Sequence, residues 1–152
     1  MKKDREYTAY CGLYCGDCIP FNQALFDSAE KLREELQKRQ FGKYAKLKSK
    51  GNKLFNDYDI FMKVLSELIK LRCLKACVNG GGNPDCHIRN CVRTRGIQGC
   101  WECPGFENCE LLESLSDYHG DTPKSNLRLI KKYGIENWTD KRGKHYVWNN
   151  TK

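Results

Sequence analysis

Ten cysteines in a chain of 152 residues are the feature most able to do chemistry. Three form a C-x3-C-x2-C group near the start of the chain, and seven follow between positions 73 and 109. The tight C-x2-C spacing occurs twice, at Cys15/Cys18 and at Cys100/Cys103. This spacing lets both thiolates of a tight turn face one metal ion, and zinc takes four such ligands. We therefore predict a metal-binding framework made of Cys11, Cys15, Cys18, Cys73, Cys77, Cys86, Cys91, Cys100, Cys103 and Cys109.

Two ways of sharing these cysteines between metal ions are open. In the first, the two C-x2-C pairs hold one ion and the four cysteines from 73 to 91 hold a second, which leaves Cys11 and Cys109 unassigned. In the second, the N-terminal group of three takes one later cysteine as its fourth ligand. We favour the first. Either way, the N-terminal loop must fold back to reach the later cysteines, or it must hold its own metal.

The alternative to metal is a set of free core cysteines with a few disulfides. The N-terminus carries no apolar signal segment and no stretch is long enough to span a membrane, so we expect a cytoplasmic protein. In a reducing cytosol, clustered cysteines are more often metal ligands than disulfides. His87 follows Cys86 directly and could replace a cysteine as ligand, or it could be an exposed polar residue.

All-cysteine sites with four ligands are closed and structural, so we predict no catalytic residues. An iron–sulfur cluster is the alternative cofactor, because all-cysteine ligation suits electron transfer. The C-x3-C-x2-C spacing also occurs in radical S-adenosylmethionine enzymes, but those use a β/α barrel, and no series of strand–helix repeats is visible here. No histidine is placed to activate a cysteine nucleophile. Whether the protein is an enzyme therefore stays uncertain.

The formal net charge of +8 raises the question of nucleic acid. Lysines 43, 46, 48, 50 and 53 form a run, and Arg89, Arg93 and Arg95 lie inside the second cysteine group. Such residues hold phosphates in some zinc modules, but they also serve as a solvated connector. Two four-thiolate zinc sites would lower the net charge to about +4. We therefore expect an unidentified protein partner, keep nucleic acid as a less favoured alternative, and expect no membrane partner.

The cysteine-free segment of about residues 22–71 must position these groups, and its periodicity is helical. Leu25, Ala29, Leu32 and Leu36 recur on one helix face. A second helix is expected from residue 52 or 53 to 71, at the centre of the core and running directly into Cys73. Its wide apolar face combines two neighbouring stripes of side chains. The first stripe contains Phe55, Tyr58, Met62, Leu65 and Ile69, and the second contains Leu54, Phe61 and Leu68.

The cysteine-free tail, residues 110–152, adds shorter elements. Residues 107–118 predict a short helix, and a helix from Pro123 to about Tyr133 should stop at Gly134. Residues 145–148 suit a short strand or a packed tail. The whole chain, residues 1–152, is then one cysteine-rich domain. Its fold class is mainly α with irregular metal-stapled loops, a small helical domain plus a zinc-knuckle-like cysteine segment between about 73 and 109.

The cysteine motifs resemble those of an uncharacterised prokaryotic family. Residues 10–18, YCGLYCGDC, resemble the CGL-type opening of a domain of unknown function, and CHIRNC, GIQGCWECP and CEL at 86–111 resemble its second half. The resemblance implies a zinc-binding group of bacteria and archaea with no assigned reaction. One departure is visible, because the family has a C-x-G-C-type pair where this chain has Cys73-x3-Cys77. The resemblance therefore does not say how these two cysteines pair.

Overall fold

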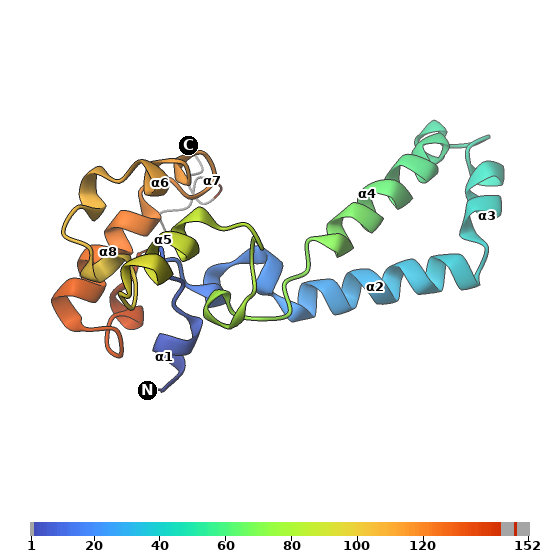
Figure 1. The fold of residues 1–152 in the computed structure, drawn as a ribbon. Helices are drawn as coiled ribbons and strands as arrows, with labels where there is room; N and C mark the ends of the chain where they lie inside the picture. The colour runs from blue at the N-terminus through green and yellow to red at the C-terminus, as the bar shows by residue number, and fades with distance from the viewer. Residues whose placement is uncertain (1, 144–147, 149–152) are drawn as a thin grey trace. The chain divides into compact units, whose positions relative to one another are not determined.

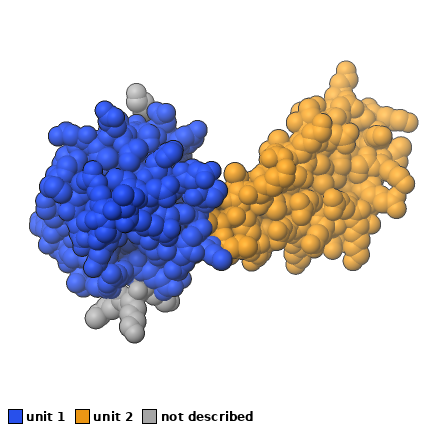
Figure 2. All heavy atoms as spheres, viewed as in Figure 1, with its two compact units in different colours: residues 1–18, 75–152 blue, residues 19–74 orange. Residues whose placement is uncertain are grey.

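The computed structural model describes residues 2–143 and Trp148, and it divides the chain into two compact units (Figure 2). Unit 1 combines residues 1–18 with residues 75–152, and unit 2 is the continuous segment 19–74. The assignment of one domain to the whole chain stays a prediction.

The described residues are mainly helical, and the cysteines lie mostly in irregular segments, as predicted. Apart from one bridge between Thr8 and Tyr14, the described residues contain no β structure. Cys91 is the one cysteine inside an α-helix. The strand considered for 145–148 lies outside the described residues, except for Trp148. Within the described part, no helix is both long and apolar enough to cross a bilayer.

Unit 2 is a pair of helices joined at one end by shorter elements (Figure 1). Helix α2 begins after Asn22, whose side chain accepts the Leu25 amide at 3.2 Å, a typical N-cap. Helix α4 packs along α2, and the small buried cluster between them contains Ala29, Leu65 and Ile69. The elements of this unit are η2 (Ile19–Phe21), α2 (Gln23–Lys38), α3 (Phe41–Lys48), η3 (Lys53–Asp57) and α4 (Tyr58–Lys70).

Two expectations for this unit are wrong. The second helix was expected at the centre of the core, but only its stripe facing α2 is buried, and Leu54 and Phe61 are 76% and 44% exposed. The reason is that α2 covers only one apolar stripe of α4. Burial of the wide face that was predicted would require a second element to cover the other stripe. The lysine-rich segment between Gly42 and Gly51, expected as a connector, forms helix α3.

The open end of the pair is closed by Arg72, just beyond α4. Its guanidinium donates to the side chains of Gln23, Asp27 and Glu30 in α2, at 2.6–2.9 Å. The next residue, Cys73, donates its amide to the Pro20 carbonyl at 2.7 Å and accepts from Gln23 at 2.8 Å. Cys73 is therefore held by loop hydrogen bonds inside unit 2, and helix α4 ends before it.

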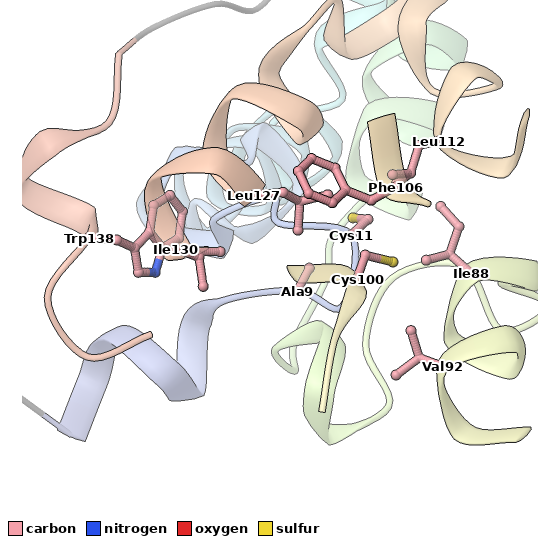
Figure 3. Close-up of a cluster of buried hydrophobic side chains, with 10 residues drawn as sticks. All are labelled: Ala9, Cys11, Ile88, Val92, Cys100, Phe106, Leu112, Leu127, Ile130 and Trp138. Atoms are coloured by element: carbon pink, nitrogen blue, oxygen red, sulfur yellow. The ribbon is translucent and has the colours of Figure 1, made fainter. Parts of the chain in front are cut away.

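Unit 1 contains the larger buried core (Figure 3). Leu127 and Trp138 are fully buried there, and the Trp138 indole donates to the Thr8 hydroxyl at 3.1 Å, which joins the N-terminal and C-terminal segments. The elements of this unit are α1 (Lys2–Tyr7), η1 (Cys15–Asp17), η4 (Cys77–Asn79), α5 (His87–Arg95), η5 (Cys100–Glu102), η6 (Phe106–Asn108), α6 (Glu110–Glu113), α7 (Ser116–His119), α8 (Thr122–Tyr133) and η7 (Thr139–Lys141).

The tail predictions are partly right. Helix α8 starts within one residue of Pro123 and stops at Gly134, whose φ of 82° suits glycine. The helix predicted over 107–118 is instead two short helices, α6 and α7. Between them the Ser114 hydroxyl donates to the Leu111 carbonyl at 2.8 Å, a local bond that competes with the helical pattern.

Candidate metal centre

The N-terminal cysteine loop folds back onto the later cysteines. The Ala9 amide donates to the Leu13 carbonyl at 2.7 Å, so residues 9–13 close a tight loop with Cys11 near its tip. The Cys100 amide donates to the Tyr10 carbonyl at 2.8 Å and links the two cysteine groups. Of the two possibilities for this loop, the structure adopts the fold-back.

Gly12 fixes the position of this loop. Its φ is +85°, and a Cβ built on it would lie 2.9 Å from the Leu127 side chain. The Gly12 carbonyl also accepts a hydrogen bond from the buried Asn126 amide at 2.9 Å. The loop that carries Cys11 therefore packs directly on α8, and only glycine fits there.

The two C-x2-C pairs form the same local turn. In η1 the Cys18 amide donates to the Cys15 carbonyl at 3.1 Å, and in η5 the Cys103 amide donates to the Cys100 carbonyl at 3.0 Å. The closing cysteines have nearly identical backbone angles, φ −80° and ψ 122° for Cys18 and φ −77° and ψ 122° for Cys103. The prediction of a tight turn at each pair is confirmed.

Four cysteines from three segments line one cavity of about 410 Å³ in unit 1. The remaining walls are mostly apolar and include Phe106 and Leu112. This grouping differs from both sequence models, because it joins the second C-x2-C pair to its neighbours in α5 and after η6. We call the four residues the cavity cysteines; they are Cys91, Cys100, Cys103 and Cys109.

Cys11 is coupled electrostatically to three other cysteines. The charges of Cys77, Cys86 and Cys100 act on the Cys11 thiol. Figure 3 shows Cys11 and Cys100 in the middle of the buried side chains of unit 1. Cys100 is therefore one of the cavity cysteines and also a neighbour of Cys11 in the buried core.

Burial makes both of these central thiols hard to ionise. Burial, together with the smaller effect of the neighbouring cysteines Cys109, Cys103 and Cys91, raises the pKa of Cys100 to about 12. Burial also raises the pKa of Cys11 far above its ordinary value, although the Leu13 amide bonded to its sulfur acts in the opposite direction. Without a cation nearby, both groups stay protonated, and a bound metal ion reverses this preference.

Two arginines of α5 direct positive charge at the sulfurs. Arg89 is 6% exposed, and its guanidinium donates to the Cys77 sulfur at 3.7 Å and to the Gly81 carbonyl. The hydrogen bond to Cys77 raises the pKa of Arg89. The Arg95 guanidinium donates to the Cys103 sulfur at 3.5 Å. The Arg89 amide donates to the sulfur of Cys86 at 3.4 Å. The sequence analysis considered these arginines as phosphate ligands or as solvated charge, and not as partners of sulfur.

Gly81 holds the loop that carries Cys77, and sequence reasoning missed it. A Cβ on Gly81 would lie 1.7 Å from the Lys75 carbonyl oxygen, so no larger residue fits without moving the backbone. The Gly81 amide donates to the Ala76 carbonyl at 3.0 Å. The run Gly80-Gly81-Gly82 was the available signal.

The structure shows no disulfide bond among the ten cysteines. Across the described residues, no three Cys, His, Asp or Glu side chains converge closely enough to hold one ion as they stand. His87, considered as a substitute ligand, is exposed. Cys73 belongs to unit 2, whereas the other nine cysteines belong to unit 1.

A family model described as a protein of unknown function, DUF3795, matches residues 7–114. The chain belongs to this family. The match covers both cysteine groups and the whole of unit 2, as the resemblance of the motifs predicted. No curated protein and no solved structure matches the chain.

Proposed function

We propose that unit 1 binds zinc through cysteine thiolates and that the metal is structural, joining loops that the helices do not hold. The observation that carries this proposal is the cavity lined by four free cysteines from three separate segments. Four thiolates are the set that a closed zinc site uses. A bound zinc ion would supply charge stabilisation for the thiolates and a fixed tetrahedral link between the three segments.

The cavity cysteines would hold one ion. A second would draw on the five other cysteines of unit 1, Cys11, Cys15, Cys18, Cys77 and Cys86. Since the sulfurs do not yet converge on one point, binding would draw them together. Such coupling of metal binding to local folding is common, because a preformed thiolate site is rarely stable without its ion.

Arg89 supports a set of anionic sulfurs. A guanidinium is always charged, and burying it without an anion is strongly unfavourable. Among the described residues its hydrogen-bond acceptors are the sulfur of Cys77 and the carbonyl of Gly81. Ionised thiolates at Cys77 and Cys86 would balance this charge. Free thiols of this kind also favour a reducing compartment such as the cytoplasm.

Metal analysis of the chain, purified anaerobically without added metal, tests the proposal. We expect about two zinc ions per chain, since each ion takes four thiolates. Detection of iron and acid-labile sulfide instead of zinc would support the iron–sulfur alternative. A chain that contains no metal and whose thiols remain free would overturn metal binding altogether.

The shared site is tested with Cys91→Ser and Cys109→Ser. Each single variant should lose one zinc ion, and the double variant should lose no more than either single one, because both residues hold the same ion. Additive loss of two ions in the double variant would show that the cavity cysteines do not form one site.

A further inference from the structure

We infer that unit 2 docks an acidic amphipathic helix of a partner protein in an apolar groove at the joined end of its helix pair. This proposal goes beyond metal binding and does not depend on it, because none of the groove residues is a cysteine. The groove has a volume of about 460 Å³. Its walls come from α2, α3, η3 and the start of α4, and we call it the hairpin-tip groove.

The hairpin-tip groove exposes large apolar side chains. Leu54 is 76% exposed, Leu32 is 47% exposed and Phe61 is 44% exposed, and all three line the groove. Exposed leucines occur singly on many surfaces, but here they share one concavity, which marks a binding site more than a solvated face.

A row of aromatic rings forms part of the same groove. The ring centroids of Phe41 and Tyr58 lie 5.4 Å apart, and those of Tyr58 and Phe61 lie 6.2 Å apart. Aromatic side chains give rigid contact area with little loss of conformational entropy, as in known docking sites. A concave surface of this kind fits the protruding side chains of a protein partner better than it fits a flat lipid surface.

The segment beside the groove is basic and favours an acidic partner, although one residue of the groove wall, Asp57, is acidic. Residues 39–56 hold one arginine and five lysines and no aspartate or glutamate. Helix α3, which carries three of these lysines, packs against η3, which carries another together with Leu54. Within the described residues, the five lysines of this segment have no carboxylate partner.

This unpaired charge argues against a second copy of the chain as the occupant. A symmetric dimer through the groove would place two such basic segments against each other, and like charges across an interface oppose association. An amphipathic helix with glutamates on either side of a stripe of Leu and Phe fits both the apolar groove and the basic segment beside it. Its apolar side chains at i, i+3, i+4 and i+7 enter the groove, and its carboxylates face the lysines.

The experiment measures binding of a fluorescent synthetic helix to the full chain as purified. The probe peptide has Leu and Phe at i, i+3, i+4 and i+7 and glutamate at its other positions, and a second peptide has lysine in place of every glutamate. We expect the glutamate peptide to bind and the lysine peptide to bind at least about tenfold more weakly. Equal binding of both peptides, or binding of neither, would overturn the proposal.

Variants locate the site. Leu54→Asp should weaken binding of the glutamate peptide about tenfold or more, whereas Leu71→Asp, at a similarly exposed leucine (63%) that does not line the groove, should leave it unchanged. Both variants should keep the helical circular dichroism and the metal content of the parent chain. Equal losses from both variants would refute the location.

The triple variant Lys43→Glu, Lys46→Glu, Lys53→Glu tests the charge. It should weaken binding at low salt, and the difference from the parent should shrink as salt rises. Two outcomes would reassign the surface: sedimentation with phosphatidylserine vesicles that depends on Leu54 without peptide binding, or a concentration-dependent dimer abolished by Leu54→Asp.

Discussion

At the scale of single residues, the unusual group is a buried guanidinium facing sulfur. Arg89 lies in the first turn of α5, where its backbone amide donates to the sulfur of the N-cap Cys86 and its guanidinium donates to the sulfur of Cys77. Groups that bond metal-ligating atoms from outside orient them and tune their charge. The sequence suggested phosphate binding as one role for this arginine. Its contact with Cys77, twelve positions away, depends on tertiary structure and therefore could not be predicted from the sequence.

If unit 1 binds zinc as proposed, replacement of Arg89 should weaken that binding without removing any thiol. We expect Arg89→Met to lower the zinc affinity of the Cys77 and Cys86 group by about 10–100-fold, because the thiolates lose their buried counter-charge. Competition with a chromophoric chelator measures this. Arg93→Met is the matched control, since Arg93 lies on the same helix but stacks over the Tyr10 ring instead of bonding sulfur. Equal affinity in both variants would contradict the role of Arg89.

His119 gives a pH dependence that is separate from the thiols. Burial lowers its pKa below the ordinary value of about 6.5, so the folded state favours the neutral imidazole. The stability that this provides is present above about pH 6.5 and is lost as the pH falls through the lowered pKa.

The measurement compares denaturant midpoints of the parent and His119→Gln between pH 7.5 and pH 5. The parent should lose more stability than the variant over this range, and any contribution common to both proteins cancels in the difference. His87→Gln, at an exposed histidine, should follow the parent. If His119→Gln follows the parent as well, the burial of His119 has no effect on folding.

At the scale of elements, local signals were reliable and long-range ones were not. The C-x2-C spacing predicted both 3-10 turns, and Pro123 and Gly134 marked α8 almost to the residue. The grouping of the cavity cysteines could not be predicted, because it depends on how α5 packs against α6 and on the fold-back of the N-terminal loop. Spacing along the chain carries neither piece of information.

Gly81→Ala should destabilise the loop that holds Cys77. The added Cβ meets a backbone carbonyl at 1.7 Å, so the loop must shift, at about 1–3 kcal/mol of unfolding free energy. Gly105→Ala is the control, because a Cβ there meets nothing within 4 Å and its φ of −95° is ordinary. Urea unfolding of the metal-loaded proteins compares the two, and equal midpoints would show that the 75–82 loop yields easily.

At the scale of the whole molecule, the chain separates a cysteine-rich unit from a helical unit, yet the family match spans both. The sequence located the two long helices of unit 2, α2 and α4, but placed the main core there, because apolar periodicity shows which face is apolar and not whether anything covers it. The main core lies in unit 1, where Leu127, Trp138 and other side chains pack around Cys11 and Cys100.

If unit 1 binds zinc as proposed, removal of the ion should affect the two units differently. Structural zinc contributes about 10–16 kcal/mol in small zinc peptides, so chelation under reducing conditions should release the loops of unit 1. Hydrogen exchange followed by mass spectrometry should then show faster exchange in α5 and in residues 97–112. Helices α2 and α4 should keep their protection, because their contacts and the bonds of Arg72 lie inside unit 2. A sample with chelator and excess zinc controls for direct effects of the chelator. Equal acceleration in both units would show that they unfold together, and it would make the bound metal a determinant of the entire chain.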